Sequence, residues 1–219
     1  PYKENPKTKG SGIVCCISQT GTCPMKCSDC FFQSGRSYLE PLVDNLPNIP
    51  DFDTATNVVR VNDGNDSNVE RDVVIAEAQR FPMRFYNTSI PHKIESFDAP
   101  VVLTLNPGVK TDEHIHLLDP VPNNLMFVRV RTNTWNLHLV EQAIERYATK
   151  DVAVVLTFMA YYDEQSIPED HRANYTYRKR TLNSYYAITT DAWRAVMKRY
   201  EDNIRVYSCG KIEGERGKT

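Results

Sequence analysis

Three cysteines near the start of the chain have a spacing that can hold a metal cluster. Cys23, Cys27 and Cys30 form a C-x3-C-x2-C pattern in one short segment that contains Pro. Thiolates are the usual ligands of iron–sulfur clusters, so three of them can hold three corners of a [4Fe–4S] cubane and leave one iron open. A structural zinc site normally takes four protein ligands. The nearest further thiols, Cys15 and Cys16, lie in an apolar run that predicts a strand, and not in the loop. The loop therefore lacks a fourth thiol for zinc, and a structural zinc site is the alternative to the cluster.

The distribution of all six cysteines bears on a second alternative, a disulfide framework. In small secreted scaffolds the cysteines are spread along the chain. Here a tight group of cysteines is followed by a long, regular pattern of strands and helices that contains only one more, Cys209. This distribution favours reduced thiols that bind a metal. We also consider the hypothesis that Cys209 belongs to an auxiliary metal site, with partners in Cys15 and Cys16 or beyond Thr219. The alternative for Cys209 is a lone, partly buried thiol.

Alternating strand and helix patterns predict an α/β chain. Strands are expected at 13–17, 57–62, 84–88, 101–105, 124–131, 152–159 and 204–208, with helices at 68–80, 137–147 and 190–200. Such alternation predicts a mainly parallel sheet. The number of units predicts a partial (β/α)6 barrel, with an N-terminal arm at 1–11 and the barrel core at 12–162. An irregular C-terminal extension at 163–219 is expected to complete or flank the barrel.

Polar residues recur at every second position of some predicted strands. Arg129 and Arg131 alternate with Val128 and Val130, and Asn106 follows a similar alternation at the end of the fourth strand. Because side chains on a strand point alternately to opposite faces, one face of these strands is polar. This pattern favours a polar lumen that can hold a charged ligand, and a solvent-facing edge strand is the alternative.

The cysteine motif, placed after the first strand and followed by Phe31 and Phe32, resembles the signature of the radical S-adenosylmethionine superfamily. With the order of strands, the resemblance extends over most of residues 12–210. One departure is Asp29, which stands where the family usually has an aromatic residue before the third cysteine. The resemblance implies a partial β/α barrel of radical S-adenosylmethionine type, a [4Fe–4S] cluster on the three cysteines, and S-adenosylmethionine as cofactor.

The resemblance also implies roles for residues at the ends of the strands. Gly64, Asn65 and Asp66 stand where the family has a Gly-Gly-Glu-like turn, whose backbone holds the methionyl amino group. Any tight turn favours such residues, which is the alternative reading of this segment. Asn106 is placed like the family's ribose-binding residue. Arg129 or Arg131 is suited to the methionyl carboxylate, and an internal salt bridge is the alternative for each.

The implied reaction is reductive cleavage of S-adenosylmethionine to a 5′-deoxyadenosyl radical, with an electron donor such as flavodoxin or ferredoxin. An oxidoreductase or a transferase would both fit, and the substrate is not implied. Polar groups such as Asn133, Tyr161 and Tyr162 are hypothetical substrate contacts. One alternative is a non-catalytic iron–sulfur or zinc binding module. Another is a nucleic-acid-modifying enzyme of the same superfamily, indicated only by the basic run at 178–180 beside Tyr175 and Tyr177.

The overall charge and hydropathy give no sign of a general affinity for nucleic acid or membranes. Lys and Arg total 26 against 28 Asp and Glu, so the formal net charge is only −2. The apolar runs are shorter than the roughly 20 residues of a spanning helix, and no leader segment opens the sequence. We therefore expect a cytoplasmic protein without a membrane anchor. His114 and His116 are spaced only loosely for a metal, and a solvated loop is more typical of their surroundings.

Overall fold

The computed structural model describes residues 1–27, 30–33, 35–106, 115–181 and 184–209. These residues divide into two compact units, each of which is considered by itself. The first contains Pro1–Thr104 and Pro122–Met126, and the second contains 105–106, 115–121 and 127–209. The predicted division at residues 11 and 162 stays a prediction.

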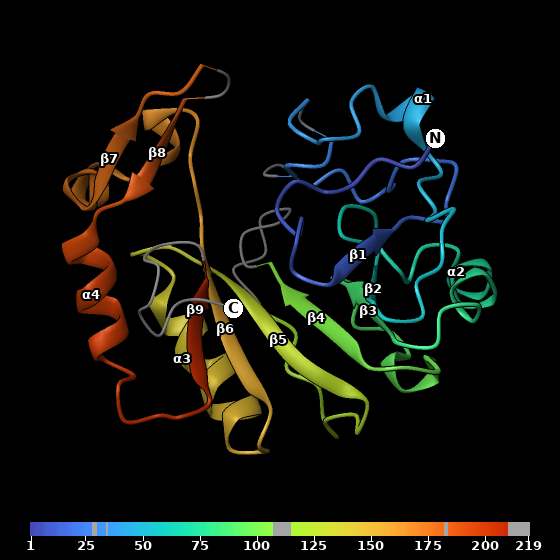
Figure 1. The fold of residues 1–219 in the computed structure, drawn as a ribbon. Coiled ribbons are helices and arrows are strands. Elements are labelled where there is room, and N and C mark those ends of the chain that lie inside the picture. Colours follow the sequence, from blue (N-terminus) through green and yellow to red (C-terminus); the bar gives the residue numbers. More distant parts are fainter. Residues whose placement is uncertain (28–29, 34, 107–114, 182–183, 210–219) are drawn as a thin grey trace. The chain divides into compact units, whose positions relative to one another are not determined.

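The first unit is built on parallel strands that pair in the order of the sequence (Figure 1). The strands are β1 (Ile13–Cys16), β2 (Val58–Val61), β3 (Arg84–Thr88) and β4 (Val101–Leu105). Between them lie α1 (Leu42–Asn45), α2 (Arg71–Ala78) and a 3₁₀ helix (Ile94–Ser96). Val14 pairs with Val59 and Tyr86 with Val101 in parallel register. Such near-continuous apolar strands are typical of a parallel sheet covered on both faces.

The N-terminal arm, residues 1–11, is fastened to the first two strands of this unit. The Tyr2 hydroxyl donates to the carbonyl oxygen of Cys15 in β1, at 2.8 Å. The Asn5 amide donates to the carboxylate of Asp63, two residues after the end of β2. The arm thus supplies hydrogen-bond partners to polar groups of this unit. A buried polar group without a partner would destabilise the folded protein.

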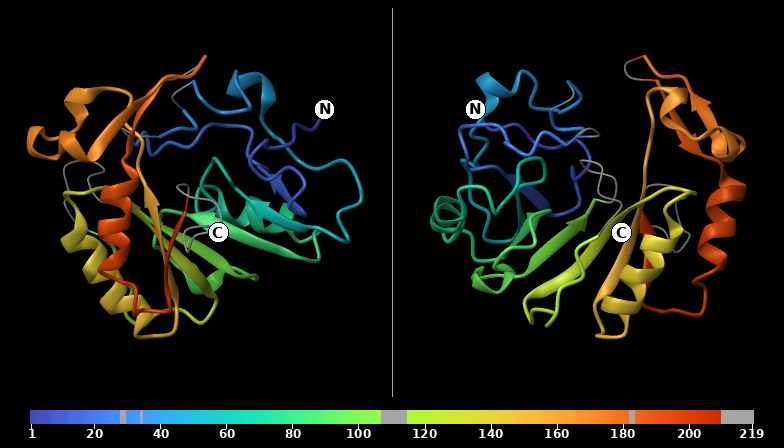
Figure 2. Two further views of the ribbon diagram at one scale, coloured as in Figure 1. Left: turned by 60° about the vertical axis from the view of Figure 1, so that its left-hand side comes forward. Right: turned by 180° about the vertical axis from the view of Figure 1, so that it is seen from behind.

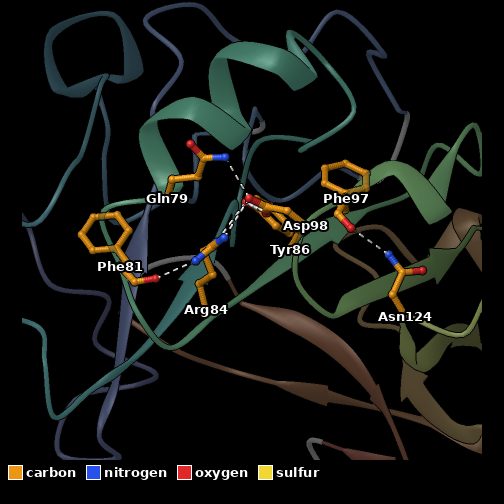
Figure 3. Close-up of polar contacts among 7 residues, drawn as sticks. All are labelled: Gln79, Phe81, Arg84, Tyr86, Phe97, Asp98 and Asn124. Atoms are coloured by element: carbon orange, nitrogen blue, oxygen red, sulfur yellow. Dashed lines mark hydrogen bonds and ion pairs between the residues drawn. The ribbon is translucent and has the colours of Figure 1, made fainter.

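A second polar cluster joins β3 to the segment before β4 (Figure 3). The Asp98 carboxylate accepts hydrogen bonds from the Tyr86 hydroxyl at 2.8 Å and the Gln79 amide at 3.2 Å, and pairs with the Arg84 guanidinium at 2.8 Å. Burial raises the pKa of Tyr86 to about 12, so its hydroxyl remains a donor at neutral pH. Partial burial alone would raise the pKa of Asp98. The three donors and the Arg84 charge outweigh that effect, and the pKa of Asp98 lies below its usual value.

Replacing Asp98 with Asn should lower the free energy of unfolding by about 1 kcal/mol at pH 7, because the charge-assisted contacts are lost. A carboxyl group whose pKa is lower in the folded state stabilises the protein above its unfolded pKa of about 3.9 and loses this effect as the pH falls through the folded pKa. Urea unfolding of both proteins at pH 7 and at about pH 3 measures the difference. The Asp98 ion pair would be irrelevant to stability if the two proteins were equally stable at pH 7.

The second unit contains three further parallel strands and an antiparallel hairpin (Figure 2). The parallel strands are β5 (Leu125–Thr132), whose first residues belong to the first unit, β6 (Ala153–Phe158) and β9 (Val206–Cys209). The hairpin consists of β7 (Tyr175–Arg178) and β8 (Tyr185–Ile188). The helices are α3 (Leu137–Ala143), which continues as a π-helix (Ile144–Ala148), α4 (Thr190–Lys198), and 3₁₀ helices at Glu164–Ser166 and Glu169–Asn174.

Helix α4 shows how the sequence sets both the start of an element and its packing. The Thr189 side chain accepts a hydrogen bond from the Ala192 N–H at 3.2 Å, which is the usual N-cap of a helix. Trp193 and Val196 lie on one face of α4 and are buried. The Trp193 indole N–H donates to the Ser208 hydroxyl at 3.1 Å, so the helix is joined to β9.

The α/β class and the parallel pairing of the predicted strands are confirmed. Among the described residues, seven strands pair in parallel, and neither unit by itself closes into a barrel. The irregular character predicted for the extension at 163–219 is only partly right, because the β7–β8 hairpin lies there. Periodicity missed this hairpin because Tyr175 and Ile188 are buried while the intervening basic residues resemble a solvated loop.

No helix in the part of the chain that the structure describes is long and apolar enough to cross a membrane.

Candidate functional site

The cysteine loop follows β1 in the first unit and is closed by contacts within itself. Cys23, Cys27 and Cys30 are half-buried, and the Cys30 N–H donates to the carbonyl oxygen of Cys27 at 3.1 Å. The Gln33 amide donates to the carbonyl oxygen of Cys23, so the end of the loop is bonded to its beginning. Lys26 has a left-handed φ of 45°, which lets the chain turn between the first two thiols.

The Cys23 thiol lies close enough to Cys27 and Cys30 for their charges to affect it. Burial raises the pKa of Cys23, the Met25 N–H lowers it, and the nearby charges of Asp66, Cys27 and Cys30 raise it further. All six cysteines of the chain are described, and none of them forms a disulfide with another described residue. In the described residues no three His, Cys, Asp or Glu side chains are arranged to hold a metal ion. The chemistry of the donor set nevertheless fits a cubane cluster, because thiolates are its usual ligands.

The turn after β2 is bonded to the base of the cysteine loop. The Asn65 amide donates to the carbonyl oxygen of Gly21 at 2.9 Å. The Gln19 amide donates to the carbonyl oxygens of Asp66 and Val69, each at 2.9 Å. Gly21 and Gln19 lie between β1 and Cys23. The structure therefore brings together two of the predicted groups of site residues, the three cysteines and the turn with Gly64, Asn65 and Asp66.

Asp66 is the residue that holds this turn in place. Its side chain is buried, with an exposed fraction of 4%. One carboxylate oxygen accepts from the Thr88 hydroxyl at 2.7 Å and the Asn68 N–H at 2.8 Å. The other accepts from the Ser89 N–H at 2.7 Å and the Ser89 hydroxyl at 3.0 Å. These bonds join the turn after β2 to the carboxyl end of β3, and they occupy both oxygens of the carboxylate.

Three polar atoms at the carboxyl ends of β1 and β2 are buried without a hydrogen-bond partner among the described residues. They are Ser18 Oγ, Gln19 Oε1 and Asn62 Oδ1. A buried polar atom without a partner costs about 1–3 kcal/mol, so native structures rarely retain one outside a functional site. Acceptors in this position fit a ligand that carries hydrogen-bond donors, such as an amino group.

Gly64 is in close contact with the cysteine loop through Phe32. A Cβ atom at position 64 would lie 2.3 Å from Phe32 Cδ2 and 2.5 Å from Cε2. The Phe32 ring has little room to move, because its exposed fraction is 1% and it packs in a cluster with Ile17, Leu39 and Leu42. The glycine therefore allows the turn after β2 to approach the loop that carries the cysteines.

Replacing Gly64 with Ala should lower the free energy of unfolding by about 1–3 kcal/mol, because the new methyl group overlaps a buried ring. Thermal or urea unfolding measures the change. Gly21→Ala is the matched control, since nothing lies within 4 Å of its Cβ position and its φ is not positive. We expect that control to stay within about 0.5 kcal/mol of the original protein. Equal stabilities of the two variants would show that the Phe32 contact is not a close one.

The remaining predicted cofactor residues lie in the second unit. Asn106 follows β4, and its Oδ1 is buried without a hydrogen-bond partner among the described residues. Arg129 and Arg131 are half-buried and alternate with buried Val128 and Val130, so the predicted polar face of β5 is present. The Arg129 guanidinium lies 5.3 Å from the centre of the Phe127 ring. The roles of these residues in cofactor binding stay predictions.

The three hypothetical substrate contacts also lie in this unit. The Asn133 amide donates to the Tyr161 hydroxyl at 3.1 Å, and both side chains are buried. Tyr162 is more exposed, at 41%. His114 lies outside the described residues, while the carbonyl oxygen of His116 accepts a hydrogen bond from a buried tyrosine hydroxyl at 2.8 Å.

The cysteines outside the motif occupy different surroundings. Cys15 and Cys16 are buried in β1, and burial raises the pKa of each to about 12. The Cys209 thiol in β9 lies 3.6 Å from the Thr157 hydroxyl. These contacts are those of ordinary packed thiols, and an auxiliary metal site at Cys209 remains a hypothesis.

Several residues that build this site were not predicted from the sequence. Gln19 gives no signal, because a glutamine before a turn has no preferred partner. Thr88 and Ser89 could have been noticed, since adjacent hydroxyl residues at the carboxyl end of a parallel strand often mark a site in α/β proteins. Phe32 was noted as part of the motif, but its contact with Gly64 was not.

Comparison of the chain with protein-family models, with curated proteins and with solved structures finds no match.

Proposed function

We propose that this chain is a radical S-adenosylmethionine enzyme that binds a [4Fe–4S] cluster through Cys23, Cys27 and Cys30. The observation that carries the proposal is the bonding of the cysteine loop to the turn after β2. Hydrogen bonds from Gln19 and Asn65 connect the two segments. The parallel α/β architecture is compatible with a partial barrel of this superfamily, which is part of the proposal.

The residues of the first unit would divide the work of holding the cluster and the cofactor. Three thiolates would hold three irons and leave one iron for S-adenosylmethionine. Asp66 keeps the turn after β2 in place, so that the backbone near Gly64 and Asn65 can orient the methionyl amino group. The cluster, when bound, would supply the electron that cleaves the carbon–sulfur bond to give methionine and a 5′-deoxyadenosyl radical.

The residues of the second unit would take the other contacts to the cofactor. A guanidinium is well shaped for a carboxylate, so Arg129 or Arg131 is assigned to the methionyl carboxylate. Asn106, whose buried Oδ1 has no hydrogen-bond partner within the described ranges, is assigned to the ribose hydroxyls. An electron donor such as flavodoxin or ferredoxin would complete the system. The substrate of the radical is not assigned.

The proposal is tested by anaerobic reconstitution with iron and sulfide, followed by dithionite and S-adenosylmethionine. We expect about four irons and four sulfides per chain and the appearance of 5′-deoxyadenosine. Stoichiometric zinc without sulfide uptake would instead identify a structural zinc module. A bound cluster that never produces 5′-deoxyadenosine would identify a non-catalytic iron–sulfur module. Either result would overturn the proposal.

A further inference from the structure

The β7–β8 hairpin of the second unit has a firm base. Tyr175 in β7 pairs with Ile188 in β8, and both side chains are buried in a cluster with Trp193 of α4. Tyr161 and Tyr186 exchange two backbone hydrogen bonds, which join β8 to the chain after β6. Figures 1 and 2 show β7 and β8 side by side next to α4. The base of the hairpin is therefore held in place by packing and hydrogen bonds, so its outer part can present side chains in a defined arrangement.

Tyrosine rings are displayed on both faces of the outer part of this hairpin. Tyr177 pairs with Tyr186, and their ring centres lie 5.2 Å apart. Arg178 pairs with Tyr185 on the opposite face. Tyr177 has an exposed fraction of 55%, whereas tyrosine is usually more buried than this in folded proteins. The outer hairpin thus offers flat aromatic surface to a partner.

Three consecutive cations accompany these rings. Arg178, Lys179 and Arg180 are exposed, and none forms an ion pair with an acidic side chain within the described ranges. The Arg180 guanidinium lies 5.0 Å from the centre of the Tyr185 ring, in cation–π contact. Other arginines behave differently, and those paired with carboxylates include Arg80, Arg84, Arg146, Arg199 and Arg205. The hairpin is a local basic surface on a chain whose net charge is −2.

We propose that the outer β7–β8 hairpin binds single-stranded nucleic acid, with Arg178, Lys179 and Arg180 on the phosphates and the Tyr177 ring stacked on a base. Cations that track the backbone and aromatic rings that stack on bases are the two features of single-strand binding sites. A duplex keeps its bases stacked inside, so it would leave the exposed ring unused. An anionic membrane would favour several large aliphatic side chains beside the cations, and Leu182 is the only one in the sequence between Tyr177 and Tyr186.

This inference does not depend on the proposed iron–sulfur chemistry, because no cysteine of the motif belongs to the hairpin. Fluorescence anisotropy of the full chain with labelled 12-nucleotide RNA and DNA of the same sequence measures the affinity directly. It needs no bound cluster, so failure of either proposal can be recognised separately.

The main comparison is between two double variants with the same change of charge. We expect Arg178→Ala/Arg180→Ala to weaken binding at least about tenfold and to reduce the slope of log K against log salt by about 1.4, or 0.7 for each lost phosphate contact. Lys150→Ala/Lys198→Ala is the matched control, since both lysines are exposed in the same unit and away from the hairpin. We expect its affinity to stay within about twofold. Equal losses in the two variants would overturn the proposal, because the effect would then be one of total charge.

A second comparison tests the ring of Tyr177. Tyr177→Ala should weaken binding about tenfold, because the stacked base loses its partner, while Tyr177→Phe should stay within about twofold of the original. Far-UV circular dichroism checks that both variants are folded. Tighter binding of the duplex than of either single strand, or binding only to vesicles that contain phosphatidylserine, would overturn the proposal. Comparison of the affinities for the RNA and for the DNA of the same sequence shows which of the two the hairpin prefers.

Discussion

Replacing Cys23, Cys27 or Cys30 singly with Ala is expected to remove most of the iron bound after anaerobic reconstitution and all formation of 5′-deoxyadenosine. Each thiolate would hold one corner of the cluster, so the loss of one leaves two ligands from the loop. The three cysteines are half-buried on a loop, and their replacement should leave the far-UV circular dichroism unchanged. Iron and sulfide per chain, electron paramagnetic resonance of the reduced protein and chromatography of the products measure the effect.

Cys209→Ala is the matched control for this series. Its thiol is free and lies beside Thr157, in β9 of the second unit. We expect that variant to bind four irons per chain and to form 5′-deoxyadenosine at the original rate. If the variant with all three motif cysteines replaced kept full iron and activity, the proposed function would be wrong. Loss of iron in Cys209→Ala would instead support the hypothesis of an auxiliary site.

Asp66→Asn should lower the free energy of unfolding by about 2–3 kcal/mol and loosen the turn after β2. Each carboxylate oxygen of Asp66 accepts from one backbone N–H, that of Asn68 or that of Ser89. An asparagine must point its NH₂ group at one of these two donors, whichever way the amide is turned. That leaves a buried backbone N–H without an acceptor, in addition to the loss of the charge-assisted bonds. Urea unfolding at pH 7 measures the change.

Asp72→Asn is the control for the same chemical change in the same unit. The Asp72 side chain has an exposed fraction of 97%, so its replacement should alter the stability by less than about 0.5 kcal/mol. Thr88→Val removes one of the hydroxyl groups that donate to Asp66. The effects of Asp66→Asn and Thr88→Val should be less than additive in the double variant, because the residues share a hydrogen bond. Full additivity, or a stable Asp66→Asn protein, would contradict the role given to Asp66.

The elements of the fold were largely predictable from local patterns. The expected strands at 84–88 and 101–105 match β3 and β4 residue for residue, and those at 13–17 and 204–208 match β1 and β9 within two residues at each end. The predicted helix at 68–80 is shorter in the structure, where α2 spans Arg71–Ala78. Glu70 has a left-handed φ of 55°, so a turn precedes the helix although the apolar spacing begins earlier. Apolar spacing reports which residues face a core, but it does not locate the last hydrogen-bonded turn.

The hairpin could not be predicted in the same way. A strand is recognised in a sequence by apolar and polar residues that alternate along the segment. Here Arg178, Lys179 and Arg180 follow one another without such alternation before the second strand begins. Only the pairing of β7 with β8 and the packing of Tyr175 and Ile188 against α4 decide that this segment is ordered structure.

The local features of this protein follow from the amino-acid sequence: the thiols of one loop, the parallel strands and the turn residues after β2. These depend on residue type and on near neighbours, through side-chain alternation and turn preference. The tertiary structure alone decided which distant groups meet. Gln19 bonds to Asp66 across 47 residues and Thr88 to Asp66 across 22, and Phe32 leaves no room for a side chain on Gly64. Such contacts depend on how parallel strands bring their carboxyl ends to one edge, and no spacing within a single segment encodes that arrangement.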